Sequence, residues 1–157
     1  MPHATQPDST DPLLGVSSKL RDDIAAQPLS ATAQTVIKVL TVMRVGVGAA
    51  CIVAPRFTCA LFKYNVPAEQ ALIVRMFGAR DAVFGELLAT AEDKERPDRG
   101  RREIKRAIWG ALAADVMDLG AIAFGVATGQ VGKTPGILLG AAAIGAIGIG
   151  AVGLRNL

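Results

Sequence analysis

The sequence predicts an all-α fold, a four-helix transmembrane bundle that follows a disordered N-terminal tail. Hydrophobic residues make up 51% of the 157 residues, and the mean hydropathy is +0.38. A soluble domain of this size rarely averages so apolar. After residue 30 come four apolar stretches, each about twenty residues long, which is the length that crosses a bilayer. They are rich in Ala and Leu and lack alternation of period two, so helices are favoured over strands.

The N-terminal region, residues 1–33, predicts a disordered cytosolic tail. It holds Pro2, Pro7, Pro12 and Pro28, four aspartates and no sustained apolar run. Such a composition buries too little apolar surface to fold alone. No signal peptide is recognisable, and at most a short helical turn is expected around residues 13–24.

The transmembrane domain is expected to cover residues 34–155, with spans at about 34–54, 68–91, 104–128 and 135–154. The first span stops at Pro55, and the polar run EDKERPDRGRRE separates the second from the third. The fourth span has no charge from Thr134 to Leu154, and it carries Gly136, Gly140, Gly145, Gly148, Gly150 and Gly153. Small residues four apart allow close helix contact in lipid. That contact can lie within one chain or form a homo-oligomer through the glycine-rich fourth helix.

The Lys and Arg residues of the connections predict the orientation. Eleven lie on the side of the tail, the polar loop and the C-terminus, and three lie on the other side. The eleven are Lys19, Arg21, Lys38, Lys94, Arg96, Arg99, Arg101, Arg102, Lys105, Arg106 and Arg155; the three are Arg56, Lys63 and Lys133. Since positive connections stay in the cytosol, the sequence predicts an integral membrane protein with both termini cytosolic.

Ionisable residues inside the predicted spans are the main functional signal. They are Arg44 in the first span, Arg75, Arg80, Asp81 and Glu86 in the second, and Asp115 and Asp118 in the third. A charge at the bilayer centre costs about 2.5–3.5 kcal/mol on insertion scales, so these side chains are expected to face one another or a water-filled cavity. Most of them fall near the middle of their spans, given a rise of about 1.5 Å per residue.

Helical periodicity predicts which of these residues share a face. Asp115 and Asp118 are three residues apart and lie together. Arg75 and Glu86 are eleven apart and project within about 20° of each other, whereas Arg80 and Asp81 point elsewhere. The second span is therefore expected to be buried on all sides, with Gly78 and Gly85 admitting a close neighbour.

The seven charges comprise three arginines and four carboxylates. If all were ionised, the cluster would carry −1, so one carboxyl is expected to hold a proton at neutral pH. Two interpretations stay open: a paired network that fixes helix packing, or a functional site, which intramembrane ionisable residues commonly mark.

The run RMFGARDAVFGELL, together with Arg44-x3-Gly48 and Asp115-x2-Asp118, resembles small four-span integral membrane proteins of fungi and bacteria that are grouped as a domain of unknown function. The resemblance covers residues 36–154. Some fungal members are similar to proteins encoded beside natural-product pathways. The resemblance therefore implies a link to lipophilic secondary metabolites, and it implies no catalytic residue.

One predicted function is an intramembrane acid–base enzyme of the isomerase, cyclase or dehydratase type, acting on a lipophilic substrate. Asp115 and Asp118 would be the acid–base pair, with Asp81 and Glu86 as further catalytic candidates. Arg44, Arg75 and Arg80 would bind substrate or act as charge partners. No cofactor motif occurs, since GQVGKT lacks the full phosphate-loop spacing. No metal site is expected, because His3 is the only histidine and Cys51 and Cys59 lack ligand spacing.

Two alternatives remain at the level of sequence. One is a non-catalytic scaffold or accessory subunit of a biosynthetic pathway, which would dock soluble enzymes through the tail and the basic loop. The other is a small carrier that works as an oligomer. The lipid bilayer is the expected partner in every case, and a lipophilic small molecule is a possible further partner. No nucleic acid is expected, because most of the modest positive excess lies in one loop.

Overall fold

The computed structural model describes residues 28–93, 96 and 98–157, and these residues form helices and turns without a strand. The helices are α2 (Ala31–Val53), α3 (Pro55–Leu61), the 3-10 turn η1 (Ala68–Gln70), α4 (Ala71–Thr90), α5 (Arg101–Ala127) and α6 (Lys133–Arg155). Four of them are long, and they follow the four predicted spans closely. The all-helical prediction is confirmed for the described residues. The turn expected around residues 13–24 lies outside them.

The start of α2 differs from the predicted end of the tail by three residues. Ala31 to Ala33 already form its first turn, because Ser30 caps the helix. The Ser30 side chain accepts a hydrogen bond from the backbone N–H of Ala33 at 3.1 Å. A serine in this position satisfies one of the backbone N–H groups that a helix start leaves free.

The first connection, predicted as a break between spans, contains a short helix. Pro55 occupies the first position of α3, where its missing N–H costs nothing. The helix lasts seven residues and ends before Lys63, which adopts a left-handed φ of 57°. The chain therefore turns back at this end of the molecule through α3 and η1 before α4 begins.

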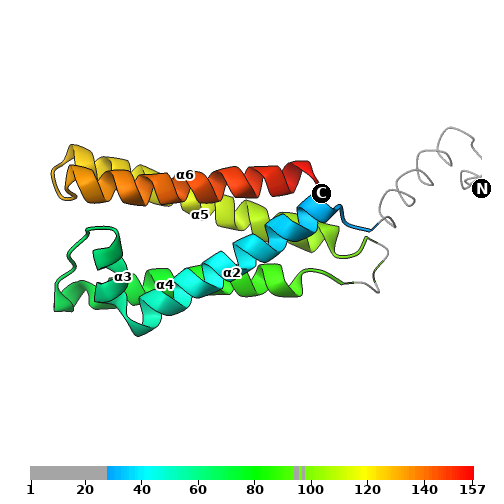
Figure 1. Ribbon diagram of the computed structural model, residues 1–157, viewed down its shortest axis with the longest axis horizontal. Helices are drawn as coiled ribbons and strands as arrows, with labels where there is room; N and C mark the ends of the chain where they lie inside the picture. The colour runs from blue at the N-terminus through cyan, green and yellow to red at the C-terminus, as the bar shows by residue number, and fades with distance from the viewer. Residues whose placement is uncertain (1–27, 94–95, 97) are drawn as a thin grey trace, which may run out of the picture.

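Helices α2 and α4 form a tightly packed antiparallel pair (Figure 1). A Cβ atom added to Gly48 would lie 2.6 Å from the carbonyl oxygen of Gly78 and 2.7 Å from the backbone nitrogen of Ala82. One added to Gly85 would lie 2.6 Å from Val45. Since real Cβ atoms do not approach this closely, glycine is required at these contacts, and the predicted close approach at Gly78 and Gly85 is confirmed.

Helices α5 and α6 form the second pair, and glycines of α6 again supply the contact. A Cβ on Gly150 would lie 3.0 Å from Leu112 of α5, and one on Gly153 would lie 2.8 Å from Val36 of α2. By contrast, Gly145 and Gly148 are exposed with nothing within 4 Å of an added Cβ. Some glycines of α6 thus serve packing inside the chain. Whether the exposed ones contact a second copy stays a prediction.

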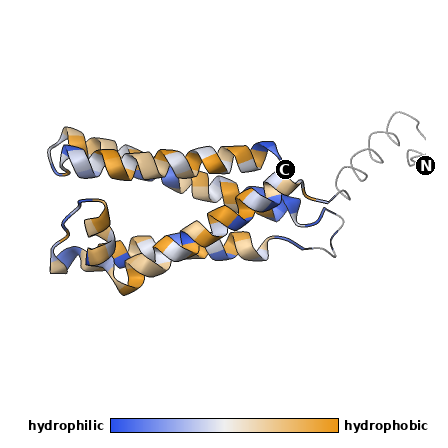
Figure 2. Cartoon of the chain, in the orientation of Figure 1, coloured by the Kyte–Doolittle hydropathy of each residue, from blue (hydrophilic) through white to orange (hydrophobic). Residues whose placement is uncertain are grey.

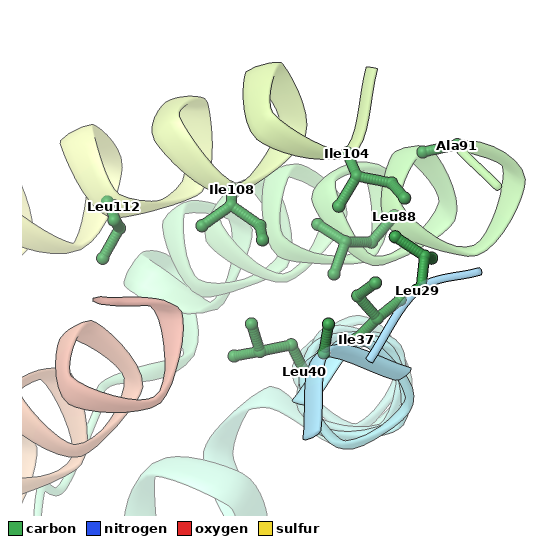
Figure 3. Close-up of a cluster of buried hydrophobic side chains, with 9 residues drawn as sticks. Leu29, Ile37, Leu40, Leu88, Ala91, Ile104, Ile108 and Leu112 are labelled. Atoms are coloured by element: carbon green, nitrogen blue, oxygen red, sulfur yellow. The ribbon is translucent and has the colours of Figure 1, made fainter. Parts of the chain in front are cut away.

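The two pairs are joined by a hydrophobic cluster at one end of the molecule (Figure 3). Its buried members come from the start of α2, the end of α4 and the start of α5: Leu29, Ala33, Ile37, Leu40, Leu88, Ala91, Ile104, Ile108 and Leu112. Away from this cluster the pairs diverge, and they lie furthest apart at the end that holds α3 (Figure 1). We call the end that holds the hydrophobic cluster the Arg101 end, after a residue that lies there, and we call the opposite end the α3 end.

Polar contacts hold the Arg101 end together. The guanidinium of Arg101 donates to the carbonyl oxygens of Leu157 at 2.7 Å and Pro28 at 3.4 Å. The Ser30 hydroxyl donates to the carbonyl of Asn156 at 3.2 Å. The start of α2, the start of α5 and the end of α6 therefore lie at the same end of the molecule.

Three helices, α2, α5 and α6, are long and apolar enough to cross a membrane. Along these helices most strongly hydrophilic residues lie near the ends (Figure 2). The helix α4 is not among them, because it carries Arg75, Arg80, Asp81 and Glu86 within its twenty residues. The expectation that this helix is buried on all sides was wrong. It exposes apolar side chains, namely Leu72, Ile73, Met76, Phe77, Val83 and Leu87.

Candidate functional site

The middle of the molecule holds a buried ion-pair cluster centred on Arg44 of α2. Its Nη1 donates to Asp81 Oδ1 of α4, and its Nη2 donates to Asp115 Oδ2 of α5, both at 2.5 Å. The side chain of Arg44 is 4% exposed, and those of Asp81 and Asp115 are 11% and 9% exposed. One guanidinium thus bridges carboxylates from two other helices and ties the two helix pairs together.

The local packing explains why Arg44 can reach both partners. Gly85 of α4 brings the two helices into close contact at Arg44, and Gly48 of α2 does so one turn further along. The Arg44 side chain can therefore reach both Asp81 of α4 and Asp115 of α5. The guanidinium carbon lies 5.9 Å from the centroid of the Phe84 ring. An aromatic face at this distance stabilises a cation.

Next to this bridge lies a second pair, Arg80 of α4 with Asp118 of α5. Two parallel hydrogen bonds join them, from Nη1 to Oδ1 at 3.0 Å and from Nη2 to Oδ2 at 2.5 Å. Bidentate pairs of this kind combine charge with fixed geometry. The side chains are 35% and 26% exposed, so this pair meets the surroundings of the protein and the Arg44 bridge does not.

The Arg80–Asp118 pair marks the place where the helix pairs separate. Among the described residues it is the last polar link between them on the way to the α3 end. Phe77 lies under Arg80 at 4.8 Å from ring centroid to guanidinium carbon and is itself partly exposed. The open side of the cluster is therefore formed by a cation, a carboxylate and an aromatic ring.

Two predicted members of the cluster lie elsewhere. Arg75 is exposed, and its Nε donates to the carbonyl oxygen of Ile52 at 3.1 Å, near the α3 end. Glu86 is exposed on α4 and forms no ion pair with any described residue. The structure thus brings together Arg44, Arg80 and the three aspartates, and it leaves out the two residues that share the other face of α4.

Thr41, Phe77 and Phe84 also lie at this centre, although they were not among the residues predicted for it. Phe77 stands three residues before Arg80, a spacing that places its ring beside this cation on one helix, whereas Phe84 contacts Arg44 of another helix, which no spacing within α4 indicates. Thr41 lies one turn from Arg44, and its buried hydroxyl oxygen has no hydrogen-bond partner among the described residues, like the Nε of Arg44. The centre therefore keeps hydrogen-bonding capacity beyond its ion pairs.

The charges of the assembled cluster define what it can do. Two guanidinium groups face three carboxylates, so one added proton makes the cluster neutral. Within the described part of the chain, no group of three or more His, Cys, Asp or Glu side chains is arranged to hold a metal ion. The paired charges can support proton transfer and the binding of a polar group through Arg80.

The chain was compared with protein-family models, curated proteins and solved structures. No protein-family model, no curated protein and no solved structure matches the chain.

Proposed function

We propose that the chain is an integral membrane protein with four spans, in which α4 crosses the membrane in addition to α2, α5 and α6. The support is the path of the chain. α2 begins at the Arg101 end, where α5 also begins and α6 finishes, so α4 must return over the same distance. Its twenty residues cover about 30 Å, the thickness of the hydrocarbon core. Its two central charges, Arg80 and Asp81, are paired with other helices. By the distribution of Lys and Arg, both termini lie in the cytosol.

Within this membrane protein, we propose that the cluster is the site of acid–base chemistry on a lipophilic small molecule. The observation that carries the proposal is the partial exposure of Arg80 and Asp118 in the middle of their helices. In hydrocarbon an exposed ion pair is unfavourable, so a polar group is expected to meet it. A substrate that carries one oxygen on an apolar skeleton, such as an enone or an epoxide, has this chemistry. The family resemblance directs the choice toward secondary metabolites.

The reaction that fits best is a proton shift within the substrate. As a carboxylate, Asp118 removes a proton from one carbon of the substrate, the electron pair of that C–H bond moves onto the substrate oxygen, and the protonated Asp118 then returns the proton to another carbon, so the protein ends as it began. Arg80 holds the substrate oxygen as negative charge develops there. The bridge of Arg44 with Asp81 and Asp115 keeps Arg80 and Asp118 in register, because α4 and α5 are both fixed to it.

A complementation experiment tests this proposal. A deletion strain of the source organism is complemented with the wild type, with Asp118→Asn or with Glu86→Gln, and its lipophilic metabolites are profiled. We expect a precursor to accumulate in the deletion strain and with Asp118→Asn, because an amide cannot exchange the proton. Glu86→Gln removes an exposed carboxyl from α4 outside the cluster and should behave as wild type. Wild-type profiles with Asp118→Asn at equal protein level would contradict an acid–base role.

A specific observation also favours a second function, that of a non-catalytic accessory subunit. Every carboxylate of the cluster already accepts a hydrogen bond from an arginine, as a purely structural lock requires. Exchanging the charges, Arg80→Asp with Asp118→Arg, separates the two functions. A lock is restored by the exchange in both stability and metabolite profile. An acid–base site recovers its stability and still accumulates the precursor.

A further inference from the structure

A second concentration of charge lies at the α3 end, separate from the central cluster. Here a pocket of about 330 Å³ opens where α2 ends, α3 begins and α4 starts. Its walls include Pro55, Arg56 and Phe57 at the start of α3, and Ala71 and Arg75 on the first turns of α4. Two arginines from different helices therefore line one small pocket.

Neither arginine is neutralised within the described part of the chain. Arg56 and Arg75 are exposed, and no described carboxylate forms an ion pair with either. The hydrogen bond from Arg75 Nε to the carbonyl of Ile52 holds this side chain against the end of α2. It uses Nε alone, so the two terminal nitrogens keep their donors for a ligand.

The rest of the lining is apolar, and the pocket lies near the ends of the helices. Arg75 is four residues into α4, which places it about 6 Å along the axis from the first residue. Val53, the last residue of α2, precedes the pocket directly. In a membrane this is the level where lipid head groups meet the hydrocarbon core. Phe57 and Ala71 offer contact to an alkyl chain beside the two cations.

We propose that this pocket binds a single anionic amphiphile. The phosphate or carboxylate of its head group lies between Arg56 and Arg75, and the first part of its alkyl chain lies against Phe57. Guanidinium groups bind such oxygens through paired, charge-assisted hydrogen bonds. The site is independent of the proposed acid–base function, because it shares no residue with the central cluster.

Native mass spectrometry of the full chain in a non-ionic detergent tests the site, because it counts bound lipids. The probe is dioctanoyl phosphatidic acid, and the neutral comparison is dioctanoyl phosphatidylcholine. We expect one bound phosphatidic acid and affinity at least about tenfold weaker for phosphatidylcholine. Arg56→Gln with Arg75→Gln should weaken phosphatidic acid by about tenfold or more. Lys133→Gln removes one positive charge at the same end outside the pocket and should change the affinity by less than about twofold.

Three results would overturn the proposal. Unchanged binding by the double variant would place the lipid elsewhere. Equal weakening by Lys133→Gln would reduce the effect to general surface attraction. Displacement of the lipid by millimolar inorganic phosphate would show that the alkyl chain contributes nothing, so that the ligand is a free anion. The single variant Arg56→Gln controls for misfolding, because this exposed side chain forms no described hydrogen bond. It should weaken binding of phosphatidic acid, and its melting temperature should equal that of the wild type.

Discussion

At the scale of single residues, the centre of the molecule depends on one guanidinium that serves two carboxylates. Arg44 is buried, and both Asp81 and Asp115 receive their described ion pair from it. The transfer of these three groups from water is costly, and only their mutual contact offsets it. Loss of the arginine therefore differs in kind from loss of one aspartate, because it leaves two like charges buried side by side.

We expect Arg44→Leu to destabilise the protein by about 3–5 kcal/mol, the cost of breaking a buried ion pair from one side. Further substitution of both partners, Asp81→Asn with Asp115→Asn, should recover a large part of this loss because no buried charge remains unpaired. Lys38→Leu removes an exposed positive charge from the same helix and should stay within about 0.5 kcal/mol. Reversible unfolding in mixed detergent micelles measures all of these. Equal stability of Arg44→Leu and Lys38→Leu would contradict the bridge.

The pairing of Arg80 can be measured with a double-mutant cycle. Arg80→Leu and Asp118→Leu should show a coupling of about 0.5–3 kcal/mol, as contacting residues do. The cycle of Arg80→Leu with Asp115→Leu should give a smaller value, because Asp115 is bonded to Arg44. Melting temperatures in one detergent suffice for the comparison. A larger coupling energy of Arg80 with Asp115 than with Asp118 would mean that Arg80 pairs with Asp115 and would contradict the Arg80–Asp118 pair.

Sequence reasoning predicted that charges gather at mid-membrane but not which ones pair. The cost of a lone charge in hydrocarbon is local and needs no knowledge of helix rotation, so Arg44, Arg80 and the aspartates could be singled out. Partner choice depends on how each helix is turned toward its neighbours. The shared face of Arg75 and Glu86 was predicted from their spacing, but that face looks outward, which no pattern in α4 alone reveals.

At the scale of helices, glycine decides which surfaces meet. On α2, Gly48 lies in backbone contact with α4, whereas Gly46, two residues earlier, is exposed with nothing within 4 Å of an added Cβ. The same helix therefore contains one glycine that packing requires and one that it does not. Gly46 and Gly48 therefore allow a test in which the same substitution is made two residues apart on one helix.

We expect Gly48→Ala to destabilise the protein by about 1–3 kcal/mol, because the new methyl group forces α2 and α4 apart. Gly46→Ala should be neutral or slightly stabilising, since alanine is the better helix former by about 1 kcal/mol. Unfolding of both variants in the same detergent gives the comparison. Similar effects of the two substitutions would exclude the tight contact between α2 and α4.

The lengths of the helices were predictable, and their lateral contacts were less so. Apolar length and breaker residues act within a few residues, so spans expected at 34–54 and 104–128 correspond to helices at 31–53 and 101–127. The short helix α3 was missed although Pro55 marks its first position, because the segment was taken as a break between spans. The exposure of α4 depends on how far the helix pairs diverge, which is a property of the assembled chain.

At the scale of the whole molecule, the two helix pairs are held at the Arg101 end and joined at the centre. The hydrophobic cluster joins them at the Arg101 end, and the ion-pair cluster joins them at the centre. Toward the α3 end the pairs diverge (Figure 1), and apolar side chains such as Phe124 and Met76 are exposed there. Apolar side chains such as Trp109 and Val152 are exposed in the other half as well, and apolar surface of this extent is typical of an interaction surface, as the proposed contact with lipid requires.

The number of spans has the sharpest whole-molecule test, because α4 alone is in question. Asn65 and Glu92 are exposed and flank α4 on its two sides. The two native cysteines are first removed by Cys51→Ala and Cys59→Ala. A single cysteine is then introduced, either by Asn65→Cys or by Glu92→Cys, and is labelled with a membrane-impermeant maleimide in oriented vesicles. If α4 spans, the two sites react from opposite sides, with Glu92→Cys on the cytosolic side beside the basic loop. If α4 lies outside the hydrocarbon core, both react from the same side. The second result would leave three spans and place the two ends of the chain across the membrane from each other, against the contacts of Arg101 with Pro28 and Leu157.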